Sequence, residues 1–234
     1  RAWDPITWGA DAIYDIIDQK LEFKGNYKIP APQLETENWV AHNGSIIPVP
    51  GRDIFIQAWY QGGISVIDFT DSTNPIEIAY FDRGPIHEKE LLTGGFWSVY
   101  YYQGAIYGTE IARGLDVLKL LPSEFLSANE IAAAALAYPT MGPRKLFNPQ
   151  QQIPMAWPDM PIVASAYVDQ FERAKAISSV TADNVRELLS QLAELIKANK
   201  SSEVGEVIFS IKKEMESVTA DQTTVDRFQR TLEG

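Results

Sequence analysis

The stretch DIFIQAWYQGGISVIDF, residues 53–69, decides the fold, because the chain repeats its pattern as GAIYGTEIARGLDVLKL at residues 104–120. The two copies align without gaps, so that Gly63 falls on Gly114. Each copy is a short β-rich run, a turn centred on glycine and an alternating apolar strand. A repeat of roughly fifty residues built from short strands indicates a β-propeller blade or another all-β array.

The first copy extends to a four-stranded unit, and the second does not. Turns rich in Gly, Pro, Asn and Asp separate the predicted strands, as in one antiparallel blade. The second unit begins at residues 94–102, turns at residues 103–104 and loses the strand pattern after Leu120. Residues 21–32 predict a strand or the remnant of a hairpin. The four strands of the first unit are predicted at residues 44–49, 54–60, 64–69 and 76–82.

The pattern becomes helical in the second half of the chain. An Ala-rich run with a start signal at Ser123 favours a helix between residues 121 and 138, and six prolines between residues 139 and 161 predict an extended linker. After the linker we expect two to three amphipathic helices, one of them capped by Thr181. The predicted fold is therefore mainly β with an α-helical C-terminal region. Its parts are incomplete propeller blades at residues 1–120, a helix and Pro-rich linker at 121–161, and a small helical bundle at 162–234.

Composition excludes several classes of function. A net charge of −11 argues against nucleic acid as a partner, since phosphate binding needs clustered Lys and Arg. The longest apolar stretch, Ile131 to Tyr138, is far short of the ~20 residues of a transmembrane span. With two histidines and no cysteine, the chain predicts neither a metal site nor a cofactor. The oxygen-rich run of residues 68–74 lacks the twelve-residue calcium loop and its closing Glu.

The residues from Gly62 to Asp82, GGISVIDFTDSTNPIEIAYFD, resemble the LVIVD-type repeat of bacterial β-propeller proteins. The resemblance lies in Gly63 and the five residues that follow it, in Asp71, and in Asn74-Pro75 with the strand after them. It covers the second unit only in part, because no Asp-x-x-x-Pro turn follows Leu120. The resemblance implies the C-terminal portion of a periplasmic or secreted propeller protein, and it implies no specific activity.

About two blades are too few for a propeller, since closure takes at least ~4. An open pair of blades leaves apolar faces in water, where they would be adhesive. We therefore expect either that the native chain is longer and supplies the remaining blades, or that a protein partner supplies them.

Five residues are candidate binding residues at a channel or on a blade face. His42 begins a first blade strand, which in a propeller faces the central channel; it is either a channel ligand or a strand-start residue bonded to a neighbouring loop. Glu110 and Arg113 either pair with each other or line the channel mouth. Trp59 and Tyr60 are either platforms for stacking a sugar or part of the core between blades. No nucleophile motif and no phosphate-binding loop is present, so no catalytic residue is predicted.

These observations predict a non-enzymatic extracytoplasmic interaction or scaffolding protein, which contributes blades and docking helices to a larger assembly. The alternative is a propeller hydrolase or lyase with a channel site near His42. A channel enzyme should gather several ionisable groups around His42, whereas a scaffold should not.

Overall fold

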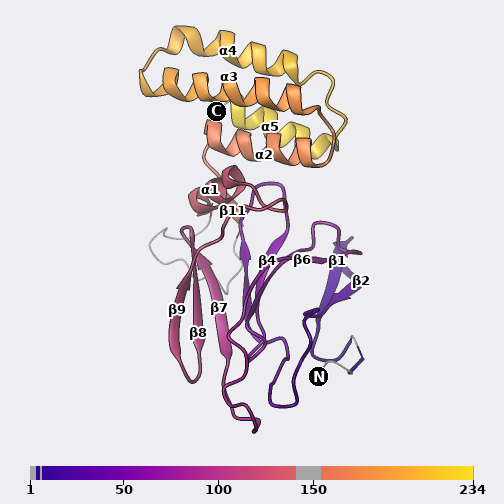
Figure 1. Ribbon diagram of the computed structural model, residues 1–234. Helices are drawn as coiled ribbons and strands as arrows, with labels where there is room; N and C mark the ends of the chain where they lie inside the picture. The colour runs from indigo at the N-terminus through magenta and orange to yellow at the C-terminus, as the bar shows by residue number, and fades with distance from the viewer. Residues whose placement is uncertain (1–3, 6, 141–153, 234) are drawn as a thin grey trace. The chain divides into compact units, whose positions relative to one another are not determined.

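The computed structural model describes residues 4–5, 7–140 and 154–233 (Figure 1). In these residues the strands form four small sheets, and there are five helices. The fold is therefore mixed α and β, which corrects the expectation of a mainly β protein: helices occupy most of the chain from residue 161 onward. The described strands do not form a closed propeller.

Contacts divide the chain into two compact units, and the division differs from the one expected from the sequence. The helix at residues 128–136 belongs to the helical unit and not to a separate linker. The first unit comprises Arg1–Pro48, Arg52–Leu121 and Pro139–Pro154, and the second comprises Val49–Gly51, Pro122–Tyr138 and Met155–Gly234.

The first sheet of the β unit is the four-stranded antiparallel meander that the sequence predicts. Its strands are neighbours in chain order, as tight turns between them require. Ile54, Ile56 and Ile64 are among its fully buried side chains, and they alternate with residues of the opposite face. The strands are β3 (Gly44–Ile47), β4 (Ile54–Ala58), β5 (Ile64–Asp68) and β6 (Ile76–Phe81).

The second sheet has three strands in the described residues, in the order in which they follow one another in the chain. Gly63 and Gly114, which align in the sequence, lie at the start of the third strand of their sheets with φ of 83° and 94°. The predicted turn at Gln103-Gly104 has positive φ at both residues, as a type I′ hairpin turn requires. Within the described residues the sheet consists of β7 (Phe96–Tyr102), β8 (Ala105–Glu110) and β9 (Gly114–Leu118).

The two sheets are joined through their first strands, β3 and β7. The Asn43 Nδ2 group donates to Ser98 Oγ at 3.1 Å. The backbone N–H of Tyr101 donates to the buried Oγ of Ser45 at 3.0 Å. These bonds give polar atoms of the interior a partner, and they fix the register of one sheet against the other.

A two-stranded ribbon, β1 (Asp11–Ile17) with β2 (Lys20–Tyr27), precedes the first sheet. Its two-residue turn has positive φ at both positions, 48° and 63°. A ribbon of two strands is only marginally stable alone. It is held by Tyr27, whose ring meets that of Trp59 edge-on at 5.9 Å and whose hydroxyl donates to Glu77 Oε2 at 3.1 Å.

The ribbon repeats a detail of the first sheet. In the β5–β6 pair, three residue pairs are followed by a bulge that leaves Ile78 unpaired. In the β1–β2 pair, three residue pairs are again followed by a bulge, which leaves Lys24 unpaired. A bulge bends a strand and increases its twist. The ribbon therefore has the same kind of bend as the hairpin of β5 and β6 in the first sheet.

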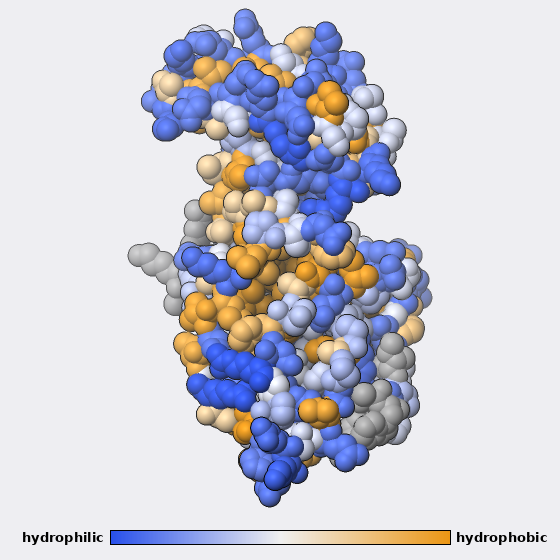
Figure 2. Space-filling model, in the orientation of Figure 1, coloured by the Kyte–Doolittle hydropathy of each residue, from blue (hydrophilic) through white to orange (hydrophobic). Residues whose placement is uncertain are grey.

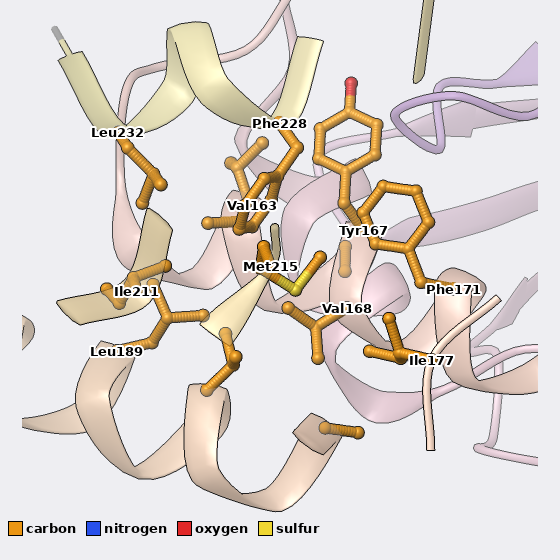
Figure 3. Packing of buried hydrophobic residues seen from close by; sticks show 14 of the residues in the cluster. Val163, Tyr167, Val168, Phe171, Ile177, Leu189, Ile211, Met215, Phe228 and Leu232 are labelled. Carbon is orange, nitrogen blue, oxygen red and sulfur yellow. The ribbon is translucent and has the colours of Figure 1, made fainter. Parts of the chain in front are cut away.

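The helical unit has one apolar core (Figure 3), into which the rings of Phe171 and Phe228 pack edge-on at 5.8 Å. Its helices are α1 (Ala128–Leu136), α2 (Pro161–Arg173), α3 (Ser179–Lys197), α4 (Ser201–Glu214) and α5 (Gln222–Glu233). Four helices follow the linker, where two to three were expected. The visible surface of this unit is mainly hydrophilic (Figure 2), as amphipathic helices around a shared core should be. No described helix is both long and apolar enough to cross a bilayer.

Two predicted helix starts are corrected by the capping bonds. Helix α1 is capped by Ser127 and not Ser123: the Ser127 hydroxyl accepts from Glu130 N, and the Glu130 carboxylate accepts from Ser127 N at 2.7 Å. Helix α3 is capped by Ser178, whose hydroxyl accepts the N–H of Thr181 at 3.1 Å. The N-cap of a helix is the residue whose side-chain oxygen accepts a hydrogen bond from a free backbone N–H two or three residues later.

Two residues of the Pro-rich linker are bonded to each other. The amide and the hydroxyl of Thr140 both donate to the carbonyl of Pro154 at 3.0 Å. Beside them, the two-residue strands β10 (Tyr138–Pro139) and β11 (Met155–Ala156) form a small sheet. The part of the linker at residues 141–153, with Pro143 and Pro149, lies outside the described residues.

Candidate functional site

The candidate site of the β unit is centred on His42, which lies just before β3. Its ring contacts two others: the centroid of Trp97 is 4.1 Å away, and that of Tyr60 is 5.0 Å away, edge-on. Tyr60 and Trp97 also meet edge-on, at 5.9 Å. The three residues form a continuous group of rings, here named the aromatic cluster.

The tautomer of His42 follows from its hydrogen bond. The Nδ1 atom lies 2.5 Å from the carbonyl oxygen of Trp97. A carbonyl only accepts, so Nδ1 carries the proton and the Nε2 atom of a neutral ring is an acceptor. The ring of His42 is thus bonded to the backbone of strand β7.

Tyr60 is placed by an unusual backbone. Its φ is 51°, and its N–H and C=O exchange bonds of 3.1 and 2.8 Å with the C=O and N–H of Phe96. Gly95 comes so close that a Cβ there would lie 1.9 Å from the carbonyl carbon of Tyr60, and the φ of Gly95 is 93°. Only glycine, which has no Cβ, can lie this close to the backbone of Tyr60.

A pocket of about 240 Å³ opens beside Tyr60. It is smaller than the ~300 Å³ at which pockets for drug-sized ligands begin. In the described part of the chain, the side chains of Asn38, Tyr60 and Thr93 make no hydrogen bond, which leaves an amide and two hydroxyls for water or a ligand. The pocket is lined by Asn38, Tyr60, Leu91, Leu92, Thr93 and Gly94.

One buried amide holds the pocket wall. The Gln61 side chain donates through Nε2 to the carbonyl of Leu92 and accepts the N–H of Ile86 through Oε1, both at 2.8 Å. Gln61 is buried and the segment that it holds, residues 86–92, is not in a strand or helix. A buried amide bonded at both its oxygen and its nitrogen fixes the two ends of this segment and preforms the pocket.

Glu110 and Arg113 support the same segment and do not pair through the guanidinium. The buried carboxylate of Glu110 accepts the N–H of Gly95 at 2.5 Å and also the N–H of Arg113. The Arg113 guanidinium donates to the carbonyl of Pro85 at 3.2 Å. The two charges therefore anchor the backbone on either side of the pocket wall.

Trp59 lies apart from this site. It is fully buried and packs with Tyr27, Ile29, Trp39 and Ile67, so it offers no face to a ligand. Of the five candidates, the structure brings His42 and Tyr60 together, places Glu110 and Arg113 behind the pocket, and puts Trp59 in the core.

Sequence reasoning missed the pocket residues. Asn38, Gln61 and residues 91–94 carry no motif, and they meet only because the segment before β7 folds back on Tyr60. The Gly94-Gly95 pair was the available signal, because adjacent glycines before a strand mark a close backbone approach.

The ribbon presents a second candidate surface. Tyr14 pairs with Phe23 across its strands and Ile16 pairs with Leu21, so the four side chains share one face. All four are exposed, with Ile16 at 77% and Leu21 at 69% of full exposure. We name this set the outer ribbon face.

Comparison of the chain with family models, curated proteins and solved structures gave no match. The resemblance to LVIVD-type repeats rests on the repeat residues alone.

Proposed function

We propose that this chain is a non-enzymatic interaction or scaffolding protein, in which the sheets act as propeller blades that stack against further blades. The further blades belong to a longer form of the chain or to a protein partner. An extracytoplasmic location is proposed with it, on the strength of the same repeat residues.

The observation that carries the proposal is the outer ribbon face. Four large apolar side chains on a two-stranded ribbon cost free energy in water, and burying an Ile or Leu side chain recovers roughly 1.5–3 kcal/mol. The opposite face of the ribbon already packs on the first sheet through Ile13 and Tyr27. A second sheet against the outer ribbon face would give the ribbon the two covered faces of a blade.

The matching bulges of β1–β2 and β5–β6 add to this argument. They make the ribbon equivalent to the outer half of a blade that lies before the first sheet. On this assignment the three sheets are consecutive blades: an outer half, a complete blade of four strands, and a blade of three strands.

The surroundings of His42 favour a scaffold over the hydrolase or lyase alternative. In the described part of the chain, its ring contacts are Tyr60 and Trp97, and its hydrogen bond goes to a backbone carbonyl. A channel enzyme should gather several ionisable groups around such a histidine, and the described ring contacts supply only the hydroxyl of Tyr60.

The test is the association state of the chain. If the outer ribbon face is adhesive, the isolated chain should self-associate in sedimentation velocity runs at rising concentration. Replacing Ile16 and Leu21 together by Ser should weaken this association at least tenfold, because two buried apolar side chains are lost. A wild-type chain that stays monomeric throughout would contradict the proposal.

Phe209 provides the matched control. It is also a large exposed apolar residue, but it belongs to helix α4 of the helical unit and not to the ribbon. Phe209→Ser should leave the sedimentation profile unchanged. Equal effects of the two variants would mean that general surface hydrophobicity drives the association.

A further inference from the structure

Trp97 is an exposed aromatic residue in contact with Tyr60, one of the residues that line the pocket. It is 48% exposed, although its ring packs on His42 and contacts Tyr60, a pocket residue. Packing on one side fixes the orientation of the indole and leaves its other surface in water. An immobilised aromatic surface loses little side-chain entropy when a ligand stacks on it.

The pocket offers hydrogen bonds without charge. Three of the residues that line it carry a polar side chain, the amide of Asn38 and the hydroxyls of Tyr60 and Thr93, and the other three are Leu91, Leu92 and Gly94. An amide and hydroxyls both donate and accept, which suits ligand hydroxyl groups. Among the described residues, the lining holds no Lys, Arg, Asp or Glu to balance a ligand charge, and the net charge of −11 further disfavours an anion.

The site is also preformed. Gln61 fixes residues 86 and 92, Glu110 fixes Gly95, and the bonded pair of Tyr60 and Phe96 fixes the opposite side. A preformed site spends little binding free energy on ordering its own loops, so a small ligand can bind measurably.

From these three features we propose that the pocket binds a neutral saccharide. One sugar ring stacks its C–H face on Trp97, while hydroxyls of the ring or of its neighbour bond to the side chains of Asn38, Thr93 and Tyr60. The volume of about 240 Å³ restricts the enclosed part to a ring-sized group. This inference is independent of the outer ribbon face and of the scaffold proposal.

The experiment is saturation-transfer NMR on the full chain with maltose, cellobiose and diacetylchitobiose as probes. We expect saturation transfer to the ring protons of at least one of them, with a Kd on the order of 1 mM. Choline and a decaproline peptide are measured beside them. Transfer to none of the three saccharides, or only to choline or decaproline, overturns the proposal.

Two variants locate the binding. Trp97→Ala should weaken it at least about fivefold, because the stacking surface is lost. Trp8→Ala is the matched control: Trp8 is 63% exposed and lies outside the aromatic cluster, so its removal should change nothing. Binding that survives Trp97→Ala, or that falls equally in both variants, overturns the assignment.

A third variant decides the outcome if Trp97→Ala does not fold. Asn38→Ala removes a half-buried amide whose side chain makes no hydrogen bond in the described residues, so the fold should tolerate it. We expect saccharide binding to weaken about threefold to tenfold, as for the loss of one hydrogen bond. Unchanged binding in Asn38→Ala would place the saccharide elsewhere.

Discussion

Replacing Asp11 by Asn should stabilise the β unit at pH 8 and leave it unchanged at low pH. Asp11 begins the ribbon opposite Tyr27, and its Oδ2 atom is buried without a hydrogen-bond partner in the described structure. Burial raises the pKa of Asp11 from its ordinary value of 3.8 to about 7. Between these two values the folded chain holds a proton that the unfolded chain releases, so stability falls as the pH rises through this window.

The magnitude follows from the size of the change in pKa. At about 1.4 kcal/mol per pH unit, the charged Asp11 costs at most roughly 4 kcal/mol above pH 7. Partial access of water to the side chain reduces the expected cost to about 2 kcal/mol. Asp11→Asn should therefore raise the free energy of unfolding by about 2 kcal/mol at pH 8 and by almost nothing at pH 4.

Urea unfolding followed by tryptophan fluorescence measures this difference, because Trp59 packs against Tyr27 at the foot of the ribbon. The control is Asp15→Asn on the same strand, where the carboxylate is exposed and lies 3.5 Å from Lys24 Nζ. That variant should show no gain at any pH. A difference between Asp11→Asn and wild type that does not grow from pH 4 to pH 8 would refute the reasoning.

Two further predictions concern stability, and differential scanning calorimetry can follow both. Gly95→Ala should lower the free energy of unfolding by more than about 3 kcal/mol, because the new Cβ would overlap the backbone of Tyr60. Gly114 has a similar positive φ but no atom within 4 Å of the position of a Cβ, so Gly114→Ala should lower it by only about 1–2 kcal/mol. Equal costs would show that backbone strain alone matters. Glu130→Ala should destabilise the helical unit by roughly 3 kcal/mol, since it removes the acceptor of the Ser127 N–H in the capping box of α1 and the partner of Arg173. Glu130→Gln should cost about half as much, because its side-chain oxygen can still accept the Ser127 N–H. A Gln variant as damaging as the Ala variant would assign the whole effect to the ion pair.

The strands were predictable because local signals and the repeat agreed. Gly63 and Gly114 align in the sequence and adopt the same positive φ at the same place in their sheets. Gln103-Gly104 is a hairpin turn that its residue types favour. Helix α1 was also predictable from its Ala-rich run. Its start was predictable too, because Ser127 with Glu130 three residues later has the capping-box pattern and Ser123 does not, but this signal was missed.

The candidate site was predictable only in part, because it depends on contacts between distant segments. His42 and Tyr60 were singled out by their places in the repeat, but the contact of His42 with Trp97 joins residues of different sheets. No local pattern shows that Gln61 holds residues 86 and 92. The number of helices was underestimated because short links without proline separate them, as between α3 and α4.

The meeting of Thr140 and Pro154 makes the segment between them a natural place for insertion. Because two hydrogen bonds already hold its ends together, a longer segment there would stretch neither neighbour. The entropic cost of lengthening a closed loop grows only with the logarithm of its length, by about 0.6 kcal/mol for each doubling. A fluorescent domain or an affinity tag could therefore be carried at this point.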